Sequence, residues 1–140
     1  MKILVAIDGS PRASAALDSL IDRLSWFRDV AELGLVFTHL PLPYKRAVAW
    51  AGKDAVQRYY DEETEEAVAP ARRVLESRGI PHSVETRVGD PAHEIVDYAN
   101  TGGFDLIVMG THGHTALANL VLGSTATKVL AMSKVPVLLL

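Results

Sequence analysis

Two patterns of hydrophobic and polar positions alternate along this chain. Short apolar runs of strand length occupy residues 2–7, 32–40, 80–88, 106–109 and 135–140. The first is almost unbroken, which is typical of a strand buried on both faces of a sheet. Longer segments lie between the runs, with apolar residues at helical spacing, over residues 11–27, 54–78 and 125–133 and from residue 91 to the glycines at 102 and 103.

Start and stop signals support these helices. Ser10-Pro11 and Asp90-Pro91 each combine an N-cap residue with proline in the first turn. Gly79 is expected to cap the end of the helix over residues 54–78. Pro70 within that helix predicts a kink or a break, because proline has no N–H to donate.

Residues 42–53 show neither period clearly. Pro43, Gly52 and the isolated aromatic residues Tyr44 and Trp50 predict a loop. A structureless loop of this length in a compact domain is often functional. We therefore expect residues 43–53 to be the part of the chain that changes on binding a ligand.

Five strands alternating with four helical connections predict an α/β fold with a mainly parallel sheet. The chain has 140 residues, which is the size of one domain, and its 49% apolar and 22% charged residues indicate a globular protein. In open sheets of this kind, ligands bind outside the carboxyl ends of the strands, where the strand order reverses. Asp8 and Gly110 follow two such ends.

Composition and charge narrow the functional classes. No apolar stretch is long enough to cross a membrane, and the run over residues 3–7 ends too soon, at Asp8-Gly9, for a signal peptide. With no cysteine, the chain forms no disulfide, which is compatible with a cytoplasmic location. Its net charge is −3 and its basic residues are scattered, so we expect neither a membrane nor nucleic acid as a partner.

The segment that carries the candidate chemistry begins at Gly110. Three glycines, Gly110, Gly113 and Gly123, follow the spacing G-x2-G-x9-G, and Ser124 and Thr125 come directly after the third. Glycines let a backbone approach a phosphate closely, and hydroxyls and amides at a helix N-terminus donate to anionic oxygens. The alternative is that the three glycines only form turns. The apolar residues among the nine that separate Gly113 from Gly123 predict a turn anchored on the protein.

These motifs resemble the nucleotide-binding branch of the universal stress protein family. The similarity runs from the Ile-Leu-Val-Ala-Ile-Asp-Gly-Ser segment that ends at Ser10, through Gly89-Asp90-Pro91, to Val-Pro-Val-Leu-Leu at the end of the chain. The glycine motif matches that family's ATP-binding signature without a gap. The resemblance implies an open sheet in the order 3-2-1-4-5 with helices on both faces, a Rossmann-like fold of the adenine nucleotide alpha hydrolase type.

The resemblance also implies a site. Asp8 and the backbone of Leu40 would hold the adenine of ATP, or of ADP or AMP, with Mg²⁺ or Mn²⁺ as a possible companion. The phosphates would lie on Gly110, Gly113, Gly123, Ser124 and Thr125. His114 follows the second glycine, where relatives often have Arg or Lys, and an ordinary histidine is largely neutral at pH 7.

The resemblance further implies a homodimer. The run over residues 135–140 would otherwise be an exposed apolar edge strand, which favours aggregation, so we expect it to pair with its copy. The protein that such a dimer would regulate cannot be identified from the sequence.

Three functional classes remain. The first is an ATP-responsive sensor or regulator, and the second is an enzyme of adenylyl or phosphoryl transfer that uses the same pocket. The first is favoured because Lys128 is the one fixed positive charge expected near the glycines, whereas transfer chemistry needs positioned cations or metal carboxylates. The third is an interaction module without a ligand. Asp8 has a simpler interpretation too, as a cap at the end of a strand.

Other candidate sites are weak. His39, His112 and His114 have no recognised metal-ligand spacing, and His93-Glu94-x-x-Asp97 lacks the second histidine of a zinc motif. The sequence contains neither a G-x-x-x-x-G-K-[ST] phosphate loop nor a G-x-S-x-G elbow.

Overall fold

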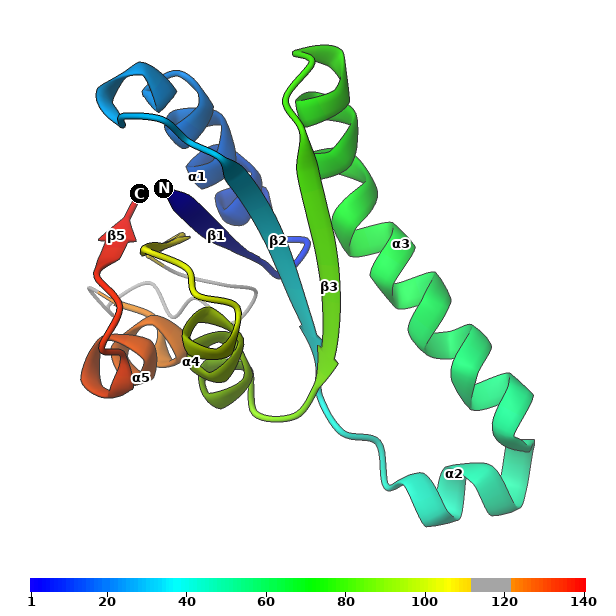
Figure 1. Ribbon diagram of the computed structural model, residues 1–140. Coiled ribbons are helices and arrows are strands. Elements are labelled where there is room, and N and C mark those ends of the chain that lie inside the picture. Colours follow the sequence, from blue (N-terminus) through cyan, green and yellow to red (C-terminus); the bar gives the residue numbers. More distant parts are fainter. Residues whose placement is uncertain (112–121) are drawn as a thin grey trace.

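A parallel five-stranded sheet forms the centre of the protein (Figure 1). The computed structural model describes residues 1–111 and 122–140, with the side chains of residues 44, 45 and 47 excepted. The strands are β1 (Lys2–Ile7), β2 (Glu32–His39), β3 (His82–Val88), β4 (Leu106–Met109) and β5 (Val137–Leu139). The helices are α1 (Pro11–Ile21), the 3₁₀ turn η1 (Leu24–Trp26), α2 (Tyr44–Ala51), α3 (Lys53–Ser77), α4 (Pro91–Thr101) and α5 (Ser124–Met132).

The strand order confirms the fold expected from the sequence. The strands lie in the order β3-β2-β1-β4-β5, and the register pairs Val5 with Leu35 on one side and with Val108 on the other. All the pairings described are parallel. The chain moves outward from β1 to β3 and then returns to β4 on the opposite side of β1. The order of the strands therefore reverses between β1 and β4.

Alternate residues of β1 divide the core into two layers. Ile3 and Val5 pack with α1 and α3 on one face of the sheet, and Leu4 packs with α4 and α5 on the other. All three side chains are fully buried. Helices therefore cover both faces, as the unbroken apolar run in the sequence predicts.

Gly34 in the middle of β2 is required by packing. The ring of Phe104 lies against its backbone, and a Cβ at this position would lie 2.8 Å from the Phe104 Cζ atom. The interruption in the apolar pattern of β2 is thus the place where a large side chain from the turn before β4 enters the core.

Helix α1 is shorter than its apolar pattern predicts. It ends at Ile21, where the Arg23 N–H bonds to the Leu20 carbonyl and tightens the last turn, and η1 follows. Periodicity alone does not separate an α-helix from a following 3₁₀ turn, because Leu24 still packs against the core at nearly the same spacing.

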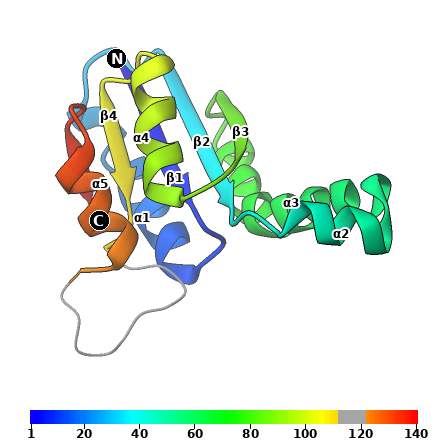
Figure 2. The ribbon, with the colours of Figure 1, turned by 90° about the horizontal axis from the view of Figure 1, so that it is seen from below.

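The prediction of a loop over residues 42–53 is wrong, because residues 44–51 form α2. These eight residues include three alanines together with lysine and arginine, all strong helix formers, so helix propensity favours the helix over a loop. Gly52 joins α2 to α3 with φ +81°, a conformation that favours glycine. We call α2 together with residues 53–66 of α3 the arm. Figures 1 and 2 show the arm extending past the carboxyl ends of the strands and away from the sheet.

Pro70 does not break α3, which continues from Lys53 to Ser77. The missing N–H leaves the carbonyl of Glu66 without its usual helical partner, but Glu66 is exposed, so water can satisfy that carbonyl. None of the helices in the described ranges is both long enough and apolar enough to cross a membrane.

Candidate functional site

The carboxyl ends of β1 and β4 lie side by side at the point where the strand order reverses. Val5 pairs with Val108, so two residues further along the strands Ile7 is level with Gly110, and Asp8 comes next. Asp8 and Gly110, far apart in the sequence, are thus neighbours at one edge of the sheet. This is the position at which parallel α/β sheets bind ligands.

A backbone hydrogen bond holds the two ends of the glycine segment together. The Gly123 N–H donates to the Thr111 carbonyl over 2.8 Å. Gly110 and Thr111 at the end of β4 therefore lie next to Gly123 and Ser124 at the start of α5. The structure confirms that this part of the motif joins a strand end to a helix N-terminus.

The N-terminus of α5 has the features of an anion-binding site. Gly123 is the N-cap residue and has no side chain to accept the N–H groups of the first turn. The backbone amides there point outward along a helix dipole that favours negative charge. In the described part of the chain, no residue forms a hydrogen bond with the hydroxyl of Ser124 or Thr125, whereas Thr127 Oγ1 donates to the Gly123 carbonyl over 3.0 Å.

Asp8 caps the turn that leads from β1 into α1. Its Oδ1 atom accepts a hydrogen bond from the Ser10 N–H over 2.9 Å, and Ser10 in turn caps α1 by accepting from the Ala13 N–H. Asp8 therefore makes the strand-end cap that its simpler interpretation expects. The turn holds the carboxyl group at the edge of the sheet that also carries Gly110.

Leu40 lies directly beyond β2, and its side chain is 69% exposed. The residue before it, His39, is 1% exposed, and both nitrogens of its ring form hydrogen bonds. Nδ1 bonds to the Glu63 carboxylate and Nε2 lies 2.9 Å from Thr64 Oγ1. The His39 carbonyl also accepts from the Gly89 N–H. The backbone that leads to Leu40 is thus fixed from α3 on one side and β3 on the other.

Lys128 does not present an isolated positive charge to the glycine segment. Its Nζ atom lies 3.0 Å from Asp90 Oδ2, so it joins α5 to the N-cap of α4. The pKa of Asp90 lies well below its usual range because His93 and Lys128 both donate hydrogen bonds to its carboxylate. For a phosphate bound at the start of α5, the positive charge of Lys128 would therefore be offset by the Asp90 carboxylate.

Several candidate residues lie outside the site or outside the described ranges. Gly113, His112 and His114, and the apolar-anchored turn expected near them, belong to residues 112–121. His39 is a packing residue, and His93 bonds to Asp90. Within residues 1–111 and 122–140, no group of three or more histidine, aspartate or glutamate side chains could hold a metal ion.

Comparison with known proteins identifies the family. The model of the universal stress protein family matches residues 1–140. The chain belongs to the universal stress protein family. The family implied by the glycine motif and the strand termini is therefore confirmed over the whole chain, and so is its Rossmann-like fold.

Individual relatives cover nearly all of this chain. Universal stress protein MJ0531 from Methanocaldococcus jannaschii is 32% identical over 137 residues, which span 98% of this chain and 79% of that protein. The solved structure of MJ0577 from the same organism matches with a TM-score of 0.80 at 28% identity, over 99% of this chain and 94% of that one. A universal stress protein solved in complex with cAMP matches with a TM-score of 0.68 at 25% identity, over 100% of this chain and 96% of that one.

Sequence reasoning missed two polar pairs that shape this edge of the sheet. One is His39 with Glu63 and the other is Asp90 with Lys128, and the partners are 24 and 38 residues apart. The available signal for the first was a histidine at the end of an otherwise apolar strand, because a buried polar side chain needs a partner. The second pair has no local signal in the sequence.

Proposed function

We propose that this protein binds ATP at the carboxyl edge of its sheet and acts as a nucleotide-responsive regulator in stress adaptation. The observation that carries the proposal is the hydrogen bond from Gly123 to Thr111, which joins the strand end after β4 to an uncapped helix N-terminus. The complex of a structurally similar universal stress protein with cAMP supports an adenine nucleotide as the ligand. We expect the protein to act in the cytoplasm, on a partner protein still to be identified.

Roles for individual residues follow from the sequence motif and the strand positions. Asp8 and the Leu40 backbone lie beyond neighbouring strands and would hold the adenine. The phosphates would lie on the backbone of the glycine segment and on the hydroxyls at the start of α5, a set that comprises Gly110, Gly113, Gly123, Ser124 and Thr125. His114 would lie on the phosphate side. Mg²⁺ or Mn²⁺ would then be held mainly by the phosphates, since its preferred ligands are oxygens.

Binding without rapid turnover is the behaviour that this arrangement supports. The amides and hydroxyls of the glycine segment would bind phosphate oxygens that are already charged in the ground state, and such uniform binding does not raise a rate. Transfer of a phosphoryl or adenylyl group needs cations aimed at the developing charge, and Lys128 is paired with Asp90. The enzyme alternative therefore needs a cation other than Lys128 at this edge of the sheet.

The most direct test is to identify what the purified protein carries. Mass spectrometry of small molecules released from freshly purified, denatured protein should detect an adenine nucleotide. Titration calorimetry should then rank ATP, ADP, AMP and cAMP. If no nucleotide is released and none binds, the protein is an interaction module with an unoccupied glycine segment, and the proposal is wrong.

We predict that ATP protects the arm and is hydrolysed slowly. Helix α2 begins at Tyr44, four residues after Leu40, and is joined to α3 through Gly52, so a ligand that fixes Leu40 should slow opening of residues 43–53. Hydrogen exchange with and without ATP measures this protection. Single-turnover assays should give less than about one hydrolysis per minute, far below typical enzymes. Turnover near one per second with Mg²⁺ would favour the enzyme alternative, and unchanged exchange would mean passive binding.

We also predict a homodimer in which β5 pairs with its copy. Strand β5 is the last of the sheet. The Pro136 carbonyl accepts from the Ile107 N–H, and the Leu140 N–H donates to the Met109 carbonyl, so both groups point toward β4. The intervening residues Val137 and Leu139 therefore direct their backbone groups to the outer edge. Leu139→Pro removes the outward N–H, so the dimer should dissociate in sedimentation experiments at micromolar concentration.

Leu139→Ala is the matched control for this substitution. It shortens the same side chain but keeps the N–H donor, so it should remain dimeric while losing some stability. A wild-type protein that is monomeric at high micromolar concentration would refute the β5 dimer. Dissociation of both variants would assign the effect to packing of the side chain instead of pairing of the strand.

A further inference from the structure

Lys128 and Asp90 join the first turns of two neighbouring helices at the edge of the sheet that carries the proposed site. Lys128 comes four residues after Ser124 on α5, so the two side chains share one side of the helix. Side chains on a helix lean toward its N-terminus, which directs the Lys128 ammonium toward the first turn of α5. Asp90 is the N-cap residue of α4, just beyond β3, and its Oδ2 atom lies 3.0 Å from Lys128 Nζ.

Packing between the two helices fixes this arrangement. Ala92 and Ala126 lie in the first turns of α4 and α5, and both belong to the buried cluster on the same face of the sheet. The N-terminal ends of the two helices are therefore held beside each other. A phosphate bound at the start of α5 would meet the charges of Lys128 and Asp90 together.

The two oxygens of Asp90 have different partners. Oδ1 accepts a hydrogen bond from the His93 N–H over 3.3 Å and lies 2.9 Å from His93 Nδ1, so it caps α4. Oδ2 faces Lys128, whose side chain is 55% exposed. The cap of α4 therefore does not depend on Lys128, and the lysine is not needed to fill the core. What the ion pair changes is the charge that a ligand meets at this edge.

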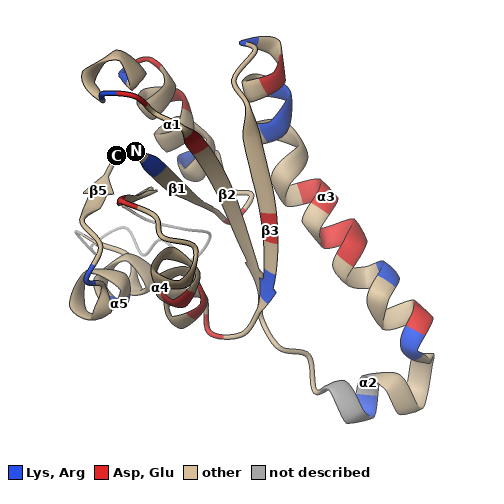
Figure 3. Ribbon diagram, viewed as in Figure 1, with Lys and Arg blue, Asp and Glu red and all other residues tan. Residues whose placement is uncertain are grey.

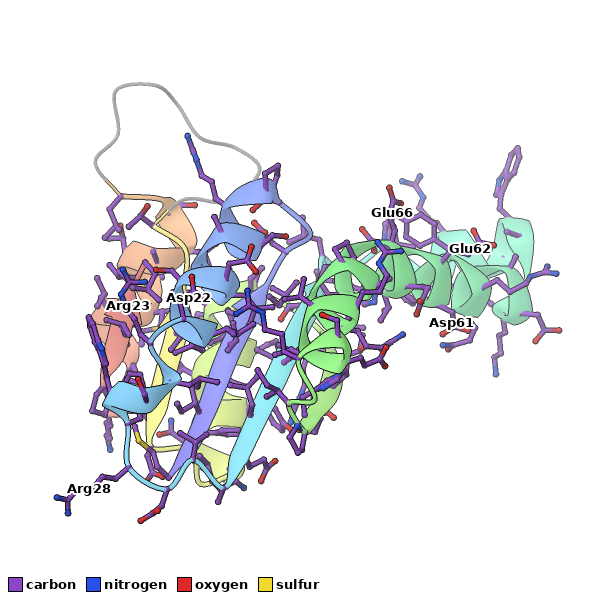
Figure 4. All side chains as sticks on the ribbon, turned by 90° about the horizontal axis from the view of Figure 1, so that it is seen from above. Asp22, Arg23, Arg28, Asp61, Glu62 and Glu66 are labelled. Carbon is purple, nitrogen blue, oxygen red and sulfur yellow. The ribbon has the colours of Figure 1, made fainter. Side chains whose placement is uncertain are left out.

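Most acidic residues of the chain cannot have this effect because they lie elsewhere. Figure 3 shows red residues where the chain enters α4 and a larger group along the middle of α3. Figure 4 labels three members of the larger group, Asp61, Glu62 and Glu66, and shows them on the arm, well separated from α5. Asp90 differs from them because its carboxylate contacts a lysine one turn from the proposed phosphate site.

We propose that Asp90 limits how strongly the protein distinguishes adenine nucleotides by their number of phosphates. The inference rests on the proposed nucleotide site at the start of α5. A lysine without a partner would attract each additional phosphate charge, which would favour ATP over AMP. The adjacent carboxylate cancels much of this attraction, because a ligand meets the two opposite charges nearly as a neutral pair. Selection among nucleotides is then left mainly to backbone amides and hydroxyls.

Asp90→Asn tests this role without removing the helix cap. Asparagine keeps an Oδ1 acceptor and is a preferred N-cap residue, so α4 should still be capped, while Lys128 presents its full charge. Titration calorimetry without divalent cations should show ATP bound about fivefold more tightly than by the wild type, AMP about twofold more tightly and adenosine equally well. These differences should shrink at about 0.5 M salt, which screens exposed charges.

Lys128→Met is the opposite variant. Methionine keeps an unbranched apolar stem but leaves the Asp90 carboxylate without its lysine, so the affinity for ATP should fall about fivefold. The double variant Asp90→Asn, Lys128→Met is neutral at both positions, as the wild-type pair is in sum. Its affinity for ATP should return to within about twofold of the wild type. Glu62→Gln removes the same charge as Asp90→Asn from the distant arm and should leave ATP affinity unchanged.

A purely structural role for the pair predicts a different result. If the ion pair only holds α4 against α5, both single variants should bind ATP and adenosine more weakly, and the double variant should bind no better than either. That result would overturn the inference. A wild type that binds ATP with the same affinity as Asp90→Asn would also overturn it, while leaving the proposed function intact. A wild type that binds no nucleotide would overturn both.

Discussion

Replacing His39 with alanine is expected to lower the free energy of unfolding by about 3 kcal/mol, the range for loss of a large buried side chain. The His39 ring is 1% exposed and packs against Phe37 and Tyr60, with centroids 4.7 and 4.6 Å away. Its two nitrogens bond to Glu63 and Thr64 on α3. Alanine would leave a cavity between β2 and α3 and remove both hydrogen bonds. Urea denaturation followed by circular dichroism measures the loss.

Glu63→Gln is the matched variant for the His39 prediction. It keeps an oxygen that can accept the Nδ1 hydrogen, so the cost should be less than about 1 kcal/mol. Hydrogen exchange should show faster opening at the base of the arm in His39→Ala, because this side chain connects the middle of α3 to the sheet. If His39→Ala is destabilised by less than about 1 kcal/mol, the ring contacts and hydrogen bonds of His39 contribute little to stability.

The fold was predictable wherever local signals agree. Ser10 and Asp90 each accept the expected hydrogen bond from the first turn of a helix. Proline follows each of them, as in the sequence-based prediction, and β4 begins and ends where its apolar run does. These elements are specified by residues a few positions apart, so a reading of the sequence captures the whole interaction.

Elements that depend on distant contacts were less predictable. Helix α2 is only eight residues long and lies between Pro43 and Gly52, so it offers too few apolar positions for a helical period to be recognised in the sequence. Strand β5 begins at Val137 instead of residue 135 because Pro136 cannot donate to a ladder. Strand β3 begins at His82, after the turn that ends α3.

The candidate site was predictable in position more than in electrostatics. The strand ends brought Asp8 and Gly110 to one edge of the sheet, as the alternating pattern requires. The charge state near the start of α5 was not predictable, because Lys128 meets Asp90 from another helix, 38 residues away. Lys128, expected as the one fixed positive charge near the glycines, is thus paired with a carboxylate.

Replacing Gly113 with valine is expected to lower the affinity for ATP about a hundredfold, or roughly 3 kcal/mol. The proposed site uses this glycine for backbone contact with the phosphates, and a branched side chain there would displace them. Titration calorimetry on both proteins measures the change. Adenosine, which has no phosphate, is the control ligand, because the proposed adenine contacts at Asp8 and Leu40 do not involve residue 113. Its affinity should change by less than about threefold, well under 1 kcal/mol. Equal ATP affinity in both proteins would remove Gly113 from the site, and an equal loss for adenosine would show that the substitution disrupts the whole pocket.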